Sequence, residues 1–392
     1  MKRILIIVVL VVVCGLGGCT GLYGRLPRVQ DVPAYAELAR QADALPWKME
    51  RVAVLPLQGK PLTMAVYDNE QMAAKEVVVL VHGLTASNWS WRFVRGALTD
   101  YRVIAVDMPG CGLSDAPDLS EMGPEGYSPS GLARCILQAL RTHLAEHPAE
   151  QFTLAGHSLG GGVVLRMFGD EALRTQYQDV LGRVKGVALY APAHMLIHEM
   201  PASIQRAASV QDWHVALAEG LGLVPDLAAG IVREGMEYET CALREIADKE
   251  KEFLRDAPQR HAMKWMIESV VPSKDGAIDW AAAENWVRQY QRVQVPCLLA
   301  WGNRDEILAT SMAYEMQREI PHAKLCIVQN AKHSLLLEQP GLCAQLLRDF
   351  VERRMGPEDV ATVVAKAPAG FGVARQEHGG DGVGGDVISR GQ

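Results

Sequence analysis

The chain has 392 residues, of which 49% are hydrophobic and 22% charged, and its formal net charge is −7. This balance is that of a globular protein and excludes an intrinsically disordered chain. The negative charge, without any block of Lys and Arg, argues against a nucleic-acid partner. The length suffices for one large α/β domain with an inserted subdomain.

Residues 1–19 have the pattern of an export signal: a basic start, an unbroken apolar run at residues 4–13, and small residues after it. Leu16-Gly17-Gly18-Cys19 resembles the lipobox of bacterial lipoproteins, in which the cysteine is acylated and becomes the first residue. The alternative is an uncleaved transmembrane anchor over about residues 4–22, just long enough to span. Both interpretations place the rest of the chain in the cell envelope, facing the periplasm or exterior. The first attaches it to the membrane by lipid on Cys19.

Residues 20–50 contain prolines and polar stretches and predict a tether followed by a short helix. Residues 51–57 and 62–67 then predict an antiparallel hairpin around a Gly-Lys-Pro turn. Six short apolar runs follow, typical of strands buried on both faces of a parallel sheet: residues 77–81, 103–106, 152–155, 184–190, 297–301 and 324–328. Helical segments lie between several of them. The sequence therefore predicts an α/β fold with a doubly wound, mostly parallel eight-stranded sheet.

The connection between the runs at 184–190 and 297–301 is too long for an ordinary crossover. Its Ala, Glu, Met and Trp content, punctuated by prolines, predicts several helices. We interpret residues 193–292 as an inserted helical lid that divides the core domain into residues 51–192 and 293–356. Residues 357–392 turn Gly-rich and predict a disordered tail.

Gly156-His157-Ser158-Leu159-Gly160 directly follows one predicted strand and precedes a helix-like stretch. Glycines flank a serine where a strand-to-helix turn is sharp, and such a turn lifts the Ser158 hydroxyl off the sheet. The same turn points the backbone N–H of Leu159 toward an oxyanion. The pattern alone is weak, and its strand–turn–helix context makes Ser158 a candidate nucleophile.

Serine needs a base within hydrogen-bond reach to act as a nucleophile at neutral pH. Asp305 lies just past the run at 297–301, and His333 lies just past the run at 324–328. Taken singly, they could be a turn aspartate and a surface-loop histidine. Both follow the carboxyl ends of predicted strands, where open α/β sheets place their sites. In the order Ser, Asp, His after successive strands, they predict a catalytic triad.

On these motifs the chain resembles the α/β-hydrolase fold superfamily, in its lid-bearing serine esterase and lipase branch, over about residues 51–354. His82-Gly83-Leu84 resembles the family's oxyanion loop, which makes the Leu84 N–H the second expected donor. Residues 107–114 resemble the next loop, where an aspartate and glycines shape the turn. We expect His82 and His157 to be structural. Glu306 is an alternative candidate for the acid of the triad, but Asp305 occupies the position that the acid has in the family.

A serine at the elbow favours acyl transfer, whereas relatives that open epoxides or remove halides use aspartate there. The resemblance therefore implies hydrolysis of carboxylic esters through an acyl-enzyme intermediate, with no metal or organic cofactor. The membrane tether and the Met and Trp residues of the lid suggest a small hydrophobic or lipid-like ester as substrate. We expect most of these residues to pack the lid onto the core and a minority to line an acyl pocket: Met195, Met200, Trp213, Met236, Met263, Trp265, Met266, Trp280 and Trp286.

Three alternatives stay open. One is a thioesterase or carbon–carbon bond hydrolase that uses the same triad. Another is an aminopeptidase-like hydrolase, for which Glu234, Glu237 and Glu239 are candidate ligands of a substrate amine. The third is a non-catalytic envelope binding protein on the same fold. The sequence leaves the oligomeric state open.

Six cysteines lie outside the signal, in spacings that match no small disulfide framework and no metal site: Cys111, Cys135, Cys241, Cys297, Cys326 and Cys343. We expect most of them to be buried thiols. Cys297 and Cys326, on predicted neighbouring strands, are the pair most open to a disulfide.

Overall fold

The computed structural model describes residues 33–147, 150–194, 211–223, 233–236, 245, 248–249, 252, 255–274, 277–353 and 363–365. Within these residues, no helix is both long enough and apolar enough to cross a membrane. Cys19 and both anchor interpretations lie outside the described residues, as do Met195, Met200, Glu237, Glu239 and Cys241.

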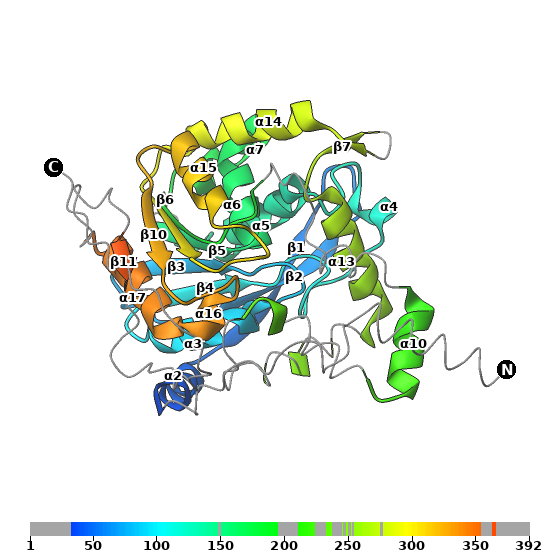
Figure 1. The fold of residues 1–392 in the computed structure, drawn as a ribbon. Helices are drawn as coiled ribbons and strands as arrows, with labels where there is room; N and C mark the ends of the chain where they lie inside the picture. The colour runs from blue at the N-terminus through cyan, green and yellow to red at the C-terminus, as the bar shows by residue number, and fades with distance from the viewer. Residues whose placement is uncertain are drawn as a thin grey trace, which may run out of the picture.

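One mixed sheet forms the centre of the molecule and confirms the predicted fold class (Figure 1). The hairpin strands β1 (Lys48–Val54) and β2 (Leu62–Asp68) pair antiparallel, with Lys48 opposite Asp68. Six parallel strands follow in the spatial order β4, β3, β5, β6, β9, β10. Their bounds are β3 (Val77–Val81), β4 (Arg102–Val106), β5 (Phe152–His157), β6 (Val184–Tyr190), β9 (Cys297–Gly302) and β10 (Lys324–Val328).

A ninth strand, β11 (Val363–Ala365), pairs parallel with β10 at the edge of the sheet. These three residues belong to the tail that the sequence predicts to be disordered, so the prediction is wrong at this point. The physical reason is the open edge of β10, whose backbone N–H and C=O groups accept another strand.

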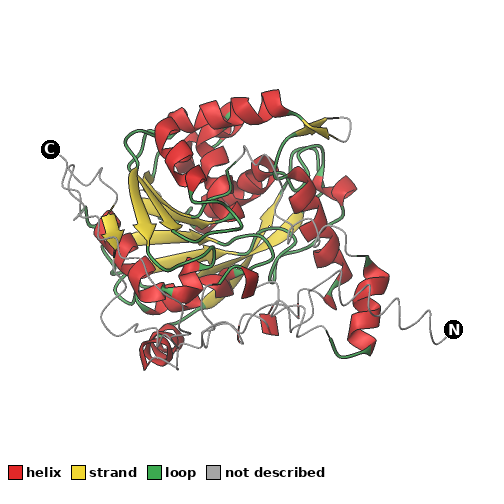
Figure 2. Cartoon of the chain, in the orientation of Figure 1, coloured by secondary structure: helices red, strands yellow, loops and turns green. Residues whose placement is uncertain are grey.

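Helices cover both faces of the sheet, which explains why β3 and β4 are buried along their whole length (Figure 2). In the view of Figure 1, the upper layer contains α5 (Pro129–His143), α6 (Leu159–Gly169), α7 (Glu171–Gln176), α14 (Trp280–Arg288) and α15 (Ser311–Glu319). The lower layer contains α2 (Pro33–Ala44), α3 (Arg92–Gly96), α16 (Leu335–Glu338) and α17 (Pro340–Val351).

The shorter elements are η1 (Asn88–Trp91), α4 (Leu119–Met122), α8 (Gln178–Leu181), β7 (Ser273–Lys274), β8 (Ala277–Ile278) and η2 (Gln289–Arg292).

Helix α5 illustrates how local sequence fixes these elements. The Ser128 hydroxyl caps its first turn by accepting the Gly131 N–H, and Pro129 at the first position cannot donate there in any case. Leu132, Ile136 and Leu140 then recur at helical spacing and are fully buried.

Between β6 and β9 the described part of the predicted lid consists mainly of α10 (Asp212–Gly220), α13 (Ala257–Ser269) and α14. Helix α13 packs onto the core, with Met263 and Met266 buried and Trp265 stacked on Tyr127. Met236 is also buried, whereas Trp213 and Trp280 are exposed. Helix α14 lies among the helices of the upper layer, and its Trp286 ring stacks under a core arginine, Arg166.

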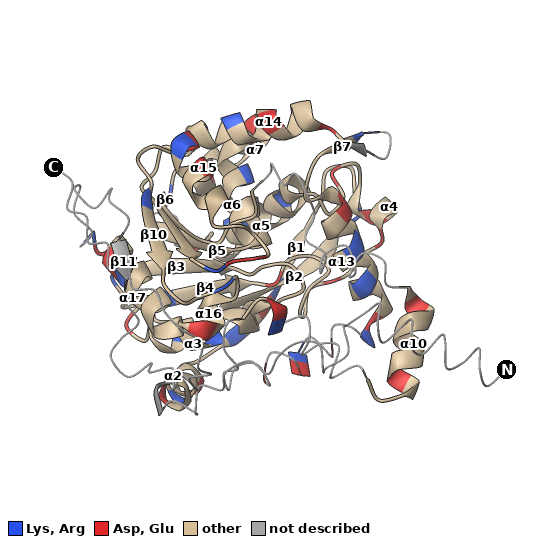
Figure 3. Ribbon diagram, viewed as in Figure 1, with Lys and Arg blue, Asp and Glu red and all other residues tan. Residues whose placement is uncertain are grey.

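Ion pairs join the two outer helices of this insertion. The Asp212 carboxylate at the start of α10 lies 3.4 Å from Arg260 and 3.1 Å from His261, both on α13. Figure 3 shows Lys and Arg interspersed with Asp and Glu over the helices of the molecule.

The described cysteines are all buried, and none of them is joined to another in a disulfide: Cys111, Cys135, Cys297, Cys326 and Cys343. The candidate disulfide between Cys297 and Cys326 is therefore absent among the described residues. The pairing of β9 with β10 places Cys326 opposite Ala300. Cys297 lies three residues away along β9, about 10 Å, which is beyond disulfide reach.

Candidate active site

Ser158 occupies the sharp turn between β5 and α6, as the sequence predicts. Its backbone has φ 52° and ψ −123°, a conformation that L-residues rarely adopt. A Cβ on Gly160 would lie 2.2 Å from the His82 carbonyl oxygen, and one on Gly156 would lie 2.8 Å from the Gly160 carbonyl oxygen. Only glycine therefore fits on either side of the strained serine.

Three residues from separate parts of the chain meet at this turn. The Nε2 atom of His333 lies 2.9 Å from the Ser158 Oγ, and its Nδ1 atom lies 2.8 Å from an Asp305 carboxylate oxygen. Asp305 follows β9 and His333 follows β10, and both side chains are buried. The structure thus brings the three predicted residues into one hydrogen-bonded chain.

These contacts determine where the protons of His333 must lie. A carboxylate accepts but does not donate, so the Nδ1 atom keeps its proton and donates a hydrogen bond to Asp305. In the neutral ring the Nε2 lone pair is then free to accept the Ser158 hydroxyl proton. This is the arrangement that general-base activation of a serine requires.

The acid is held rigidly by its own loop. The Asp305 Oδ1 atom accepts the backbone N–H groups of Ile307 at 2.9 Å and Leu308 at 2.8 Å, which leaves Oδ2 for His333. The neighbouring Glu306 points elsewhere: its side chain is 74% exposed and pairs with Lys332. The geometry therefore places Asp305, and not the substitute acid Glu306, beside the histidine.

Glu338 positions the histidine loop, and the sequence analysis missed it. Its Oε2 atom accepts the Lys332 N–H at 2.8 Å, although the side chain is buried on α16. The Ser334 N–H donates to the Gly235 carbonyl at 2.7 Å, which ties the same loop to the insertion. A glutamate a few residues past the histidine belongs to no recognisable pattern, so no sequence signal marked it.

His157 supports the triad from the side. Its Nε2 lies 3.0 Å from the His333 carbonyl oxygen. Burial, together with the nearby charge of the His333 ring, lowers the pKa of His157 to about 3. The ring therefore stays neutral and donates the Nε2 proton to that carbonyl. This agrees with the expected structural role.

The expected oxyanion loop lies against the nucleophile. A Cβ on Gly83 would lie 3.0 Å from the Ser158 Cβ, which shows how closely the backbone of the loop approaches. Leu159 is the first residue of α6, and the N–H groups of a first helical turn have no partner within their helix. Leu84 follows Gly83 on the loop.

His82 ties two loops together from a fully buried position. Its Nε2 accepts the Met108 N–H at 3.0 Å, so its Nδ1 carries the proton and donates to the Gly83 carbonyl at 2.7 Å. Burial lowers the pKa of His82 and keeps the ring neutral. Its contacts are those of a buttress for the oxyanion loop.

Asp107 organises the neighbouring loop, which the resemblance singled out. Its carboxylate accepts hydrogen bonds from the Tyr67 hydroxyl, the Leu113 N–H, and the Asn88 N–H and side-chain amide. Gly112 has φ +54°, and a Cβ there would lie 2.1 Å from the Asp107 Oδ2. The close turn around the carboxylate therefore requires glycine.

No group of three or more His, Cys, Asp or Glu side chains within the described ranges is placed to hold a metal ion. Of the residues suggested for an amine-binding subsite, only Glu234 is described.

Comparison with known proteins identifies the family of this fold. The model of the alpha/beta hydrolase fold family matches residues 76–340. The AB hydrolase superfamily protein YfhM of Bacillus subtilis is 24% identical over 290 residues, which cover 71% of this chain and 91% of that protein.

Two solved structures show the same fold. A thermophilic esterase from Thermogutta terrifontis has a TM-score of 0.55 at 21% identity, covering 78% of this chain and 98% of its own. A membrane phospholipase A, described as a bacterial virulence factor, has a TM-score of 0.54 at 20% identity, covering 90% of this chain and 99% of its own. The family match spans more than half of the chain and includes all three residues of the hydrogen-bonded chain, so the protein belongs to the alpha/beta hydrolase fold family.

Proposed function

We propose that the protein is a serine hydrolase that cleaves carboxylic esters through an acyl-enzyme intermediate. The observation that carries the proposal is the continuous hydrogen-bonded chain from the Ser158 Oγ through His333 to Asp305. A serine, and not an aspartate, at the strained turn favours acyl transfer over the opening of epoxides.

In the proposed reaction the Ser158 Oγ attacks the acyl carbon while the His333 Nε2 takes its proton. The carbonyl oxygen becomes an oxyanion that accepts the N–H groups of Leu84 and Leu159. His333 then gives its Nε2 proton to the leaving alcohol. In the second half, water loses a proton to His333 and attacks the acyl-enzyme, which releases the acid and restores Ser158. Asp305 holds the Nδ1 proton throughout and stabilises the imidazolium.

The substrate class belongs to the same proposal: a hydrophobic or lipid-like ester. The solved structures of the same fold include an esterase and a membrane phospholipase A. The proposed lipid anchor on Cys19 would hold the site next to a membrane, where such esters occur.

Labelling with a fluorophosphonate tests the nucleophile directly. We expect wild-type protein to become labelled and Ser158→Ala to stay unlabelled and to lose hydrolysis of p-nitrophenyl esters. Ser269→Ala is a matched control, because among the described residues that hydroxyl bonds only the carbonyl of Trp265 within its own helix. Labelling of Ser158→Ala at the wild-type level would refute the assignment. Absence of labelling in folded wild-type protein would favour a binding protein.

A series of p-nitrophenyl esters from acetate to laurate tests the substrate class. The proposal predicts that kcat/KM rises with acyl-chain length. A fall with chain length would contradict the hydrophobic assignment and leave the nucleophile untouched. Matched thioesters and carbon–carbon bond substrates in the same assay separate the alternatives that share the triad.

We also propose that the protein is a lipoprotein of the cell envelope, acylated on Cys19. Globomycin, or the change Cys19→Ser, should then leave an unprocessed precursor of lower mobility. Cys14→Ser lies in the same segment and should be processed normally, so it serves as the control. Unchanged mobility after both treatments would favour the transmembrane anchor.

A further inference from the structure

A cavity of about 410 Å³ lies beside the oxyanion loop. Its walls come from the end of α2 and the following loop, from residues 85–89, from α3, and from the loop after β4. Ser158 and His333 are not among the described residues that line it. The cavity is therefore distinct from the candidate active site, although residues 85–89 directly follow Leu84 in the sequence.

Arg95 on α3 contributes a buried positive charge to this cavity. The residue is only 6% exposed, and its Nη1 finds no hydrogen-bond acceptor among the described residues. The guanidinium stacks on the Trp47 ring, with 3.9 Å between its carbon and the ring centroid. This contact fixes the plane of the guanidinium but gives it no counter-ion.

The other charges around the cavity have partners. Arg92 forms a two-point contact with Asp43 at 2.7 Å and lies 2.8 Å from Glu245. Lys249 lies 3.3 Å from Glu252. Asp107 already receives four hydrogen bonds from neutral donors. No ion pair of Arg95 is found within the described part of the chain.

The charge on Arg95 is present at neutral pH. Burial and the neighbouring Arg92 lower the pKa of Arg95 to about 10, and the Asp43 carboxylate, itself paired with Arg92, opposes part of this shift. A buried charge without a partner is costly to a fold, so a side chain kept in this state calls for a ligand that supplies the missing charge.

The other side chains that line the cavity indicate the chemistry of the rest of the ligand. Trp47 and Tyr67 stack with 5.7 Å between ring centroids and 15° between ring planes. The Trp47 indole N–H donates to Asn88, which holds the stack in place. Aromatic side chains therefore form part of the wall beside Arg95, and a compact apolar body suits such a lining. The volume lies in the range of small-molecule pockets.

We propose that this cavity binds a carboxylate carried on a compact aromatic body. A guanidinium fork matches a carboxylate by two parallel hydrogen bonds. The apolar part of the ligand contacts the wall that Trp47 and Tyr67 help to form. The proposal does not depend on the esterase reaction, because it invokes no residue of the triad.

The test uses 2-naphthoate as probe, on full-length protein carrying Ser158→Ala so that no turnover interferes. We expect saturable binding by titration calorimetry. Arg95→Met should weaken binding about tenfold or more, since a charged hydrogen bond is lost. The neutral isostere 2-naphthamide should bind the Ser158→Ala protein about tenfold more weakly than the acid. Arg348→Met is the matched control: Arg348 also stacks on a ring, that of Tyr101, but pairs with Asp100.

Equal binding of 2-naphthoate to the Arg95→Met and control variants would overturn the proposal. So would tighter, Arg95-dependent binding of 2-naphthyl phosphate, which would assign the site to phosphates. Thermal unfolding of Arg95→Met shows whether the variant folds, and we expect no loss of stability because an unpaired buried charge is removed. If Arg95→Met does not fold, Leu113→Trp places a large ring at the exposed rim of the cavity and should abolish binding.

Discussion

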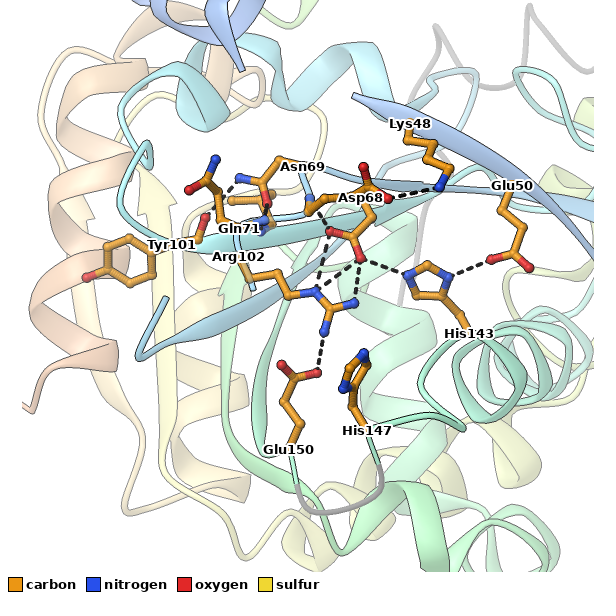
Figure 4. Close-up of polar contacts among 12 residues, drawn as sticks. Lys48, Glu50, Asp68, Asn69, Gln71, Tyr101, Arg102, His143, His147 and Glu150 are labelled. Atoms are coloured by element: carbon orange, nitrogen blue, oxygen red, sulfur yellow. Dashed lines mark hydrogen bonds and ion pairs between the residues drawn. The ribbon is translucent and has the colours of Figure 1, made fainter. Parts of the chain in front are cut away.

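Two histidines, at opposite ends of the sheet, each have a hydrogen-bond partner on both ring nitrogens, yet they serve different purposes. His333 lies beyond the carboxyl ends of the parallel strands, between Asp305 and the Ser158 hydroxyl. His143, the last residue of α5, lies at the other end, between the carboxylates of Glu50 at 2.8 Å and Asp68 at 3.0 Å (Figure 4).

The network around His143 continues to Arg102 at the start of β4. Asp68 lies 2.6 Å from the Arg102 guanidinium, which also contacts Glu150 at 2.7 Å (Figure 4). Burial alone would lower the pKa of His143, but its hydrogen bonds to Asp68 and Glu50 outweigh burial and raise it. Burial alone would raise the pKa of Asp68, but hydrogen bonds from His143 and Arg102 lower it to about 2.

The comparison shows that the partner on the second ring nitrogen decides what a histidine does. A second carboxylate favours the protonated form of His143, in which both ring nitrogens donate. A hydroxyl in the same place leaves the Nε2 atom of His333 free to accept and return a proton. The first arrangement stabilises a fold, and the second suits catalysis.

The sharpest test removes the charge that orients His333. Asp305→Asn should lower kcat by about 10⁴-fold, because the amide favours the wrong histidine tautomer. The unfolding temperature should change little, since the amide oxygen of the substituted side chain can still accept the Ile307 and Leu308 N–H groups. Ester hydrolysis and thermal unfolding of the same sample measure both quantities. A loss of activity below about tenfold would contradict the proposed role of Asp305.

A substitution in the network around Asp68, at the opposite end of the sheet, should change the stability of the protein and not its activity. Arg102→Met leaves Asp68 and Glu150 without their buried cation and should lower the free energy of unfolding by about 3–5 kcal/mol. Urea unfolding measures this, and kcat per folded molecule should stay at the wild-type value. Arg141→Met is the control, because its pair with Asp179 is exposed and should contribute less than about 1 kcal/mol.

His143→Gln should destabilise the protein in a pH-dependent way. A pKa raised in the folded state adds stability below the unfolded value of about 6.5, and this stability is lost as the pH rises through the folded pKa. We therefore expect a cost of about 2 kcal/mol at about pH 5.5 and a smaller cost at about pH 9. Unfolding curves at both pH values check this. An equal cost at both would show that His143 is held neutral.

The smallest effect concerns the support of His333. His157→Phe removes the N–H donated to the His333 carbonyl, a hydrogen bond of about 1 kcal/mol, and should lower kcat about fivefold. Because the pKa of His157 is already about 3, the pH–rate profile between about pH 5 and 9 should keep its shape. A shift of that profile would make His157 a participant in proton transfer.

The sequence was informative where function is tied to local pattern and chain order. Ser158 sits in a short motif that its own turn explains, and Asp305 and His333 each follow a predicted strand. The network of Asp68 and Arg102 left no such trace, since its members lie 34 positions apart and match no motif. The candidate disulfide between Cys297 and Cys326 is absent for a related reason. Strand register decides which side chains face each other, and apolar runs do not reveal register.

The order of the triad along the chain has a consequence for biosynthesis. His333 comes 175 positions after Ser158, on a loop that follows the last long strand of the sheet. A growing chain therefore contains the nucleophile long before the base that would activate it. During synthesis, the serine remains an ordinary alcohol until β10 has joined the sheet. Under the proposed function, hydrolysis would therefore begin only when most of the chain has folded.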